Sequence, residues 1–151
     1  MSEAVGVAEV VKLFGGRSTL RWEPRTALEA HQILLEGLPK SSFVYLIANL
    51  AVIKTDAALE TALGMSLRTL QRKKKDIEGT LSREQSGRAW KFAEILAKAT
   101  AVLGSREEAE RWLEQPALGL DRRRPIDLLA TPAGTQLVED YLTRLEYGVY
   151  M

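Results

Sequence analysis

The first candidate for chemistry is a ten-residue stretch, SLRTLQRKKK at residues 66–75, in which basic side chains follow one another with no acidic residue among them. Lys and Arg side chains that neutralise phosphates give binding that weakens steeply with salt. Arginine can also read guanine, and glutamine adenine, through hydrogen bonds to base edges. The stretch has the chemistry of a DNA-contacting helix, and the residues that we predict to take part are Ser66, Arg68, Thr69, Gln71, Arg72, Lys73, Lys74 and Lys75. A solvated basic helix face is the alternative.

The residues around this stretch predict two short helices joined by a tight turn. Thr55 or Asp56 can cap a first helix with apolar residues on one side, and Gly64 permits the positive φ that such a turn requires. Ser66 can then cap the basic helix. This order is the helix-turn-helix pattern, in which the second helix enters the major groove. Because one module of this size seldom binds specifically alone, we expect a homodimer that reads two half-sites of an operator.

The C-terminal end is the second unusual feature. Tyr147, Val149, Tyr150 and Met151 lie around an apparent helix stop at Gly148, where chain ends are normally polar and frayed. Apolar side chains at such a place favour burial, and two interpretations are open. The tail packs back onto the protein's own core, or it inserts into the groove of a partner, where aromatic side chains often dominate the binding energy.

Composition limits the classes of function. The 151 residues are 46% apolar, which is enough for one domain or two small ones, and the net charge of +1 means that any DNA binding must depend on a local patch. The chain has no cysteine, and its one histidine, His31, has no evident acid or nucleophile beside it. We therefore expect no enzyme activity, metal or cofactor. The first residues include Glu3 and no basic leader, so a cytoplasmic protein without a membrane partner is expected.

Helical signals continue along the chain, and no stretch alternates with the period of a strand. A short helix ended by Gly15-Gly16 is expected within residues 1–38, which we predict to be the least ordered part. An apolar stripe begins after Ser41, and Ser82 with Gln85 matches a capping box for a helix that ends at Gly104. The fold class predicted from these signals is all-α.

Two more caps divide the last part of the chain. Ser105 opens a short helix that Pro116 ends, and Thr131 followed by Pro132 is a strong helix start. In the last helix the predicted buried face consists of Leu137, Val138, Tyr141, Leu142 and Leu145. Between these helices, the run Arg122 to Arg124 is interpreted as a solvated loop, with contact to a partner as the alternative.

Several of these segments resemble a known family. LGMSLRTLQRKK looks like the helix-turn-helix of Xre-type antitoxins, and the chain from AWKFAEIL to LEYGVY is similar to the toxin-binding domain of the antitoxins called Xre, MbcA and ParS. The resemblance covers roughly residues 40–151. Its more specific part is an ordered run of Trp112-Leu113, Pro116, Leu120, Pro125, Leu128-Leu129, Gly134 and Tyr147-Gly148-Val149.

The resemblance implies an antitoxin of a bacterial type II toxin-antitoxin system, with a RES-domain, NAD-consuming toxin as partner and repression of its own operon through DNA binding. It also implies that the C-terminal segment covers the toxin's active site, through Arg144, Glu146, Tyr147, Gly148, Val149, Tyr150 and Met151. The expected domains are an N-terminal extension (1–38), a helix-turn-helix DNA-binding region (39–80) and a small helical toxin-binding domain (81–151). A plain helix-turn-helix transcriptional regulator without a toxin partner is the alternative.

Overall fold

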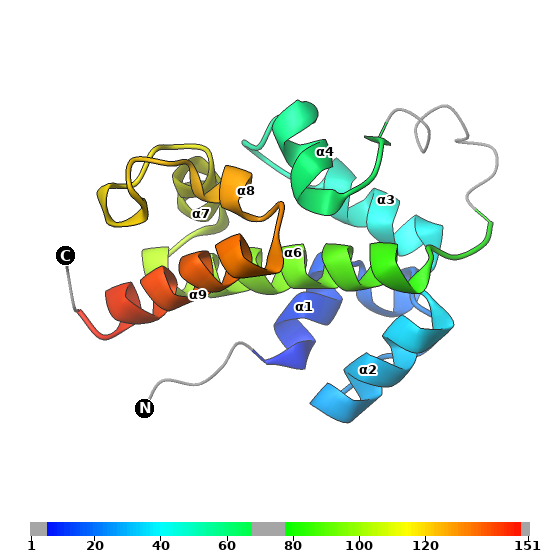
Figure 1. The fold of residues 1–151 in the computed structure, drawn as a ribbon. Helices are drawn as coiled ribbons and strands as arrows, with labels where there is room; N and C mark the ends of the chain where they lie inside the picture. The colour runs from blue at the N-terminus through cyan, green and yellow to red at the C-terminus, as the bar shows by residue number, and fades with distance from the viewer. Residues whose placement is uncertain (1–5, 68–77, 149–151) are drawn as a thin grey trace.

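The computed structural model describes residues 6–67 and 78–148 (Figure 1). Within these two ranges the chain forms helices and no strands, which confirms the all-α prediction. The elements are α1 (Val7–Leu13), η1 (Gly16–Ser18), α2 (Ala27–Glu36), α3 (Lys40–Ala48), α4 (Ala57–Leu63), α6 (Arg83–Leu103), α7 (Arg106–Leu113), η2 (Leu118–Leu120), α8 (Pro125–Leu128) and α9 (Pro132–Glu146), where η denotes a 3-10 helix. No helix in the described ranges is long and apolar enough to cross a membrane.

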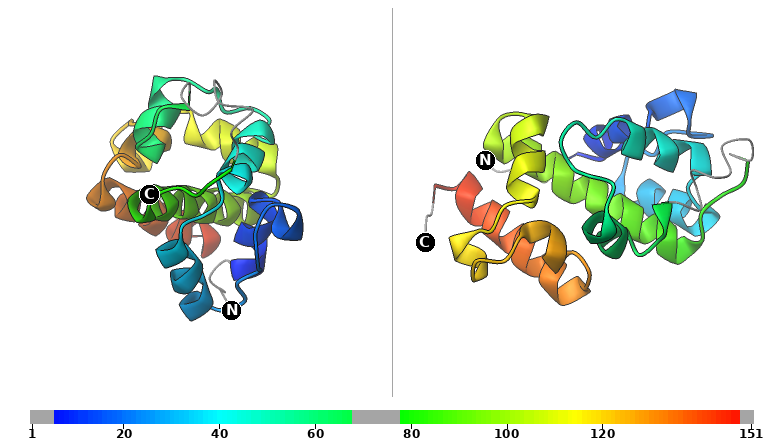
Figure 2. Two further views of the ribbon diagram at one scale, coloured as in Figure 1. Left: turned by 90° about the vertical axis from the view of Figure 1, so that its right-hand side faces the viewer. Right: turned by 90° about the horizontal axis from the view of Figure 1, so that it is seen from above.

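Helix α6 is the central element, and α1, α2, α4, α7 and α9 all pack against it (Figures 1 and 2). Its start is the predicted capping box, in which Ser82 and Gln85 exchange side-chain to backbone hydrogen bonds, and it ends at Gly104 with φ of 101°. Small residues such as Ala89 and Ala93 are fully buried along its length. Because their side chains are short, neighbouring helices can approach the α6 backbone closely.

Residues 6–38 form α1, η1 and α2, although the sequence led us to expect the least order in the segment 1–38. Helices α1 and α2 pack on α6, and Val10 and Phe14 are buried in the same core as α6. The Phe14 ring stacks on that of Trp90, with 5.8 Å between the ring centroids. The local sequence did not show this order because these apolar residues are buried in a core that they share with α6.

Helix α4 has the ends that the sequence predicts. The Asp56 carboxylate accepts hydrogen bonds from the backbone N–H groups of Ala58 and Leu59, and Gly64 ends the helix in the left-handed region with φ of 68°. The apolar side of α4 is buried, with Leu59 and Leu63 fully covered. Helix α4 contacts both α6 and α8, so it packs against an element from the C-terminal half of the chain.

The last helix also begins as predicted, since Thr131 accepts a hydrogen bond from the Gly134 N–H and Pro132 occupies the first turn. Its expected buried face is wrong at one position: Val138 and Leu142 are buried, but Leu137 is 55% exposed. The five apolar residues span a wide arc of the α9 surface, and the elements that pack on α9 cover a narrower one. Only the part of the arc that faces α6, α8 and η2 is covered, and Leu137 lies outside it.

Candidate functional site

The predicted DNA-contacting helix is described only at its start. Ser66 is exposed and follows the Gly64 turn, whereas the other seven predicted residues, 68 to 75, lie outside the described residues. Leu67 is buried, and its N–H donates a hydrogen bond of 2.6 Å to the carboxylate of Glu60 in α4. This acceptor, one turn before the end of α4, was not anticipated from the sequence. It fixes the point at which the chain leaves the turn toward the basic stretch.

The return of the chain after residue 78 is also defined by hydrogen bonds. The Lys40 N–H donates to the Gly79 carbonyl at 3.0 Å, and the Leu81 N–H donates to the Leu38 carbonyl at 2.8 Å. The Leu38 N–H in turn donates to the buried hydroxyl of Ser86 on α6. Both ends of the segment that contains the basic stretch are therefore bonded to the helical body.

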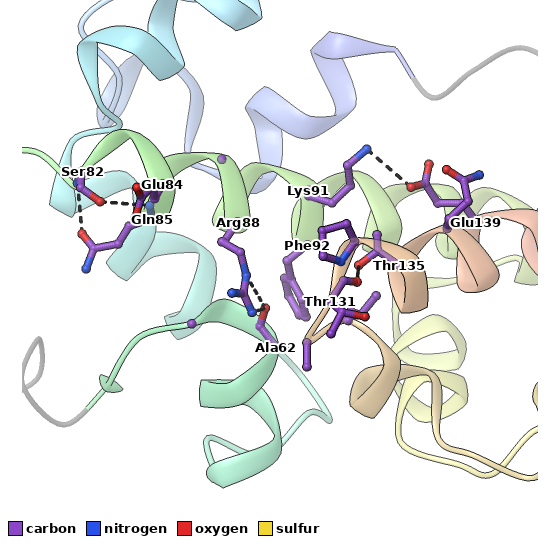
Figure 3. Close-up of a pocket in the computed structure, with 16 residues that line it drawn as sticks. Ala62, Ser82, Glu84, Gln85, Arg88, Lys91, Phe92, Thr131, Thr135 and Glu139 are labelled. Atoms are coloured by element: carbon purple, nitrogen blue, oxygen red, sulfur yellow. Dashed lines mark hydrogen bonds and ion pairs between the residues drawn. The ribbon is translucent and has the colours of Figure 1, made fainter.

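Helix α4 is fixed at its C-terminal end by Arg88 of α6. The Arg88 guanidinium donates hydrogen bonds to the carbonyls of Thr61 (2.7 Å) and Ala62 (2.9 Å), as Figure 3 shows for Ala62. These carbonyls are among the last of α4, and such carbonyls receive no hydrogen bond from an N–H group of the helix itself. A cation at a helix C-terminus also interacts favourably with the helix dipole.

A cleft of about 830 Å³ lies between α4, α6 and the start of α9 (Figure 3). Lys91 reaches across it to Glu139, with 3.5 Å between the charged atoms, and also pairs with Glu94 at 3.4 Å. Thr131 and Thr135 line the opposite wall and are engaged in helix capping and a backbone hydrogen bond. The cleft therefore marks the boundary between the N-terminal and C-terminal halves, with charged side chains that bridge it.

The buried Glu110 of α7 is a polar contact that sequence analysis missed. Its carboxylate is fully buried and accepts hydrogen bonds of 2.8 to 3.0 Å from the N–H groups of Ala51, Val52 and Ile53, in the loop between α3 and α4. Arg106 lies on the same side of the carboxylate, with 3.4 Å between its Nε and Glu110 Oε2. The available signal was an acidic residue between Ala109 and Leu113, on the apolar side of a short helix.

The predicted toxin-contacting residues lie at the end of α9. Arg144, Glu146, Tyr147 and Gly148 are exposed, and Tyr147 is 62% exposed rather than packed on the core. Gly148 has φ of 71°, so the expected glycine stop is confirmed, one residue after the C-cap Tyr147. The remaining three predicted residues, 149 to 151, lie outside the described residues.

Two exposed leucines lie on elements of the C-terminal half that pack on each other, η2 and α9. Leu118 in η2 is 76% exposed and Leu137 in α9 is 55% exposed. Element η2 packs on α9 at Tyr141, which is one turn from Leu137 and stacks on Trp112 with 5.9 Å between the ring centroids.

Arg122 and Arg123 of the arginine run are exposed, as a solvated loop predicts, whereas Arg124 is held by a side-chain partner. Arg124 donates two hydrogen bonds of 2.9 Å to the carboxylate of Asp127, and these bonds raise the pKa of the guanidinium above its usual value. Asp121 and Arg122 adopt positive φ, at 56° and 61°, in the tight turn after η2.

No cluster of metal-ligating side chains is present among the residues that the structure describes.

These features define an all-helical protein with the start of a helix-turn-helix in its first half and a helical second half whose last helix ends in exposed side chains. Residues 29–94 match the model of the antitoxin Xre-like helix-turn-helix domain, and residues 98–148 match that of the antitoxin Xre/MbcA/ParS C-terminal toxin-binding domain. The chain belongs to the family of Xre-type antitoxins.

Curated relatives are similar over parts of their length. The chain is 33% identical to an antitoxin Xre of Yersinia enterocolitica over 95 residues, which are 62% of this chain and 64% of that protein. It is 35% identical to an antitoxin Xre of Pseudomonas putida over 68 residues, or 45% of this chain and 43% of that protein. An antitoxin Xre of Photorhabdus laumondii is 28% identical over 118 residues, or 78% of each chain. The chain thus spans less than two thirds of the first two relatives.

Proposed function

We propose that this protein neutralises a cognate RES-domain, NAD-consuming toxin by covering the toxin's active site with its C-terminal segment, and that it represses its own operon by binding DNA. The single observation that carries the proposal is the presence of both domain types in one chain. Helix α6 connects them, because the two matched regions meet near its C-terminal part. Neutralisation and DNA binding are then activities of one folded unit.

The exposure of the α9 end supports the neutralising role. Arg144, Glu146 and Tyr147 project from the last turn of α9 or just beyond it, where the helical body does not cover them. A tyrosine that is mostly exposed gains binding energy when a partner's pocket covers its ring, and its hydroxyl retains a polar contact. The mechanism is occlusion, in which the segment from Arg144 to Met151 occupies the volume that NAD requires in the toxin.

The entry to the basic stretch supports the DNA-binding role. The Gly64 turn and the Glu60 contact place Ser66 on the surface, and five cations follow in the sequence within residues 68–75. In the proposal, Arg68, Gln71 and their neighbours contact operator DNA, with two copies of the chain on two half-sites. A toxin that changes the DNA affinity of the antitoxin must, by linkage, have its own affinity changed by DNA to the same extent.

The test uses the protein encoded beside this chain's gene as the toxin. NAD breakdown by that protein is measured with added full-length chain and with a chain that ends at Arg144. The full chain is expected to stop NAD breakdown, and the shortened chain to bind without inhibiting. Equal inhibition by both would place neutralisation in the folded domain, and no NAD breakdown without antitoxin would favour a plain transcriptional regulator.

A further inference from the structure

Helix α7 and the loop between α3 and α4 share a set of hydrogen bonds that the proposed function does not use. Three side chains at intervals of four residues contact the loop of residues 49–54: Arg106 and Glu110 of α7, and Glu114 at its C-cap. Arg106 donates to the Asn49 carbonyl at 2.5 Å, and Glu114 accepts from the Lys54 N–H at 3.2 Å. Glu110 lies between them and accepts from three consecutive N–H groups, those of residues 51 to 53. We call this set the Glu110 contact.

The Glu110 contact requires a specific geometry. The Glu110 carboxylate and the loop N–H groups each lose free energy of folding if their hydrogen-bond partner is absent. A fully buried carboxylate loses its hydration and needs partners, and buried N–H groups without an acceptor are also destabilising. Glu110 Oε1 accepts from all three loop residues, whereas Oε2 accepts from Ala51 and faces Arg106. These bonds form together only when α7 and the loop keep one relative position.

The loop leads directly into the helix-turn-helix. Asp56, which caps α4, follows the loop by two residues, so the Glu110 contact sets the N-terminal end of α4 while Arg88 sets its C-terminal end. Figure 2 shows the loop curving back to the side of the yellow helix α7. The loop lies within the region that matches the helix-turn-helix domain, and Glu110 lies within the region that matches the toxin-binding domain.

We propose that Glu110 is a positioning residue for DNA binding, which orients α4 and the Gly64 turn after it from within the toxin-binding domain. This inference rests on the proposed DNA binding. Glu110 is completely buried and so does not touch DNA itself. Any partner that displaces α7 would change operator affinity through the Glu110 contact, because the orientation of α4 depends on it.

The test compares Glu110→Gln with Glu107→Gln in the full-length chain. Both substitutions remove one negative charge from α7, but Glu107 is exposed, so it is the matched control. In Glu110→Gln an NH2 group replaces one acceptor oxygen and faces N–H donors. Binding to a labelled duplex from the promoter of the chain's own gene is measured by fluorescence anisotropy, at a temperature where circular dichroism shows each variant to be folded. Hydrogen exchange of the amides of residues 51 to 53 is followed in parallel.

Glu110→Gln is expected to lose on the order of tenfold in duplex affinity, within the usual range for coupled sites, with faster exchange of the three amides and an unchanged salt dependence. The control is expected to bind like the natural protein. If Glu110→Gln does not fold, Glu114→Ala, which removes only the acceptor of the Lys54 N–H, is expected to lose a smaller part of the affinity. If a folded variant shows faster exchange of these amides but binds the duplex with unchanged affinity, the role of Glu110 is overturned while the proposed DNA binding stands. A natural chain that binds no promoter duplex would overturn the proposed DNA binding, and this inference with it.

Discussion

The replacement of Gly134 by alanine is expected to destabilise the protein through one identifiable contact. Gly134 is in the first turn of α9, and an ideal Cβ there would lie 2.0 Å from the carbonyl oxygen of Leu128 and 2.9 Å from its carbon. Carbon and oxygen atoms in contact are normally about 3.3 Å apart. The main chain of α8 must therefore move by more than roughly 1 Å relative to α9, since the obstacle is backbone rather than a flexible side chain.

The magnitude follows from two opposing terms. Overpacking of this kind costs about 1–3 kcal/mol, and a clash with backbone belongs at the upper end. Alanine gains roughly 0.5–1 kcal/mol over glycine in a helix. We expect Gly134→Ala to lower the free energy of unfolding by about 2 kcal/mol, which for a chain of this length lowers Tm by about 4–8 °C.

The matched control is Gly87→Ala, the same substitution in α6. An ideal Cβ at Gly87 meets no atom within 4 Å. Only the helix-propensity term then remains, and the free energy of unfolding should rise by about 0.5–1 kcal/mol. Urea unfolding of both variants, followed by far-UV circular dichroism, gives the two signs directly. If Gly134→Ala unfolds at the same or higher urea concentration than the natural protein, crowding against Leu128 is not what that glycine avoids.

Two further predictions concern α4 and α9 and use the same unfolding measurement. Asp56→Ala should lower the free energy of unfolding by about 1 kcal/mol, because two N–H groups at the start of α4 lose their acceptor; no loss would mean that water replaces the cap without cost. Leu142→Ala should cost about 2–5 kcal/mol as a buried truncation, whereas Leu137→Ala should change stability by less than about 0.5 kcal/mol because Leu137 is mostly exposed. Similar losses at the two leucines would contradict the exposure of Leu137.

The sequence by itself determined the features that depend on a few neighbouring residues. The caps at Asp56, Ser82 and Thr131 and the glycine stops at Gly64 and Gly104 are all found where the residue types predict them. A cap is a hydrogen bond to a backbone group two or three residues away, so its donor and acceptor are close in any helical conformation. Helix type and order, and with them the family resemblance, follow from such local signals.

The tertiary structure alone decided which apolar and charged residues are buried. Glu110 lies 57 to 59 residues from the amides that it binds, and no local pattern brings an acid in α7 to the loop before α4. Periodicity likewise marked Leu137 as apolar without showing that α9 is covered on a narrower arc. The segment 1–38 was predicted to be the least ordered for the same reason, although it contains α1 and α2. Burial is a property of the surfaces that meet, and it is set by the packing of α6 against its neighbours rather than by either sequence segment alone.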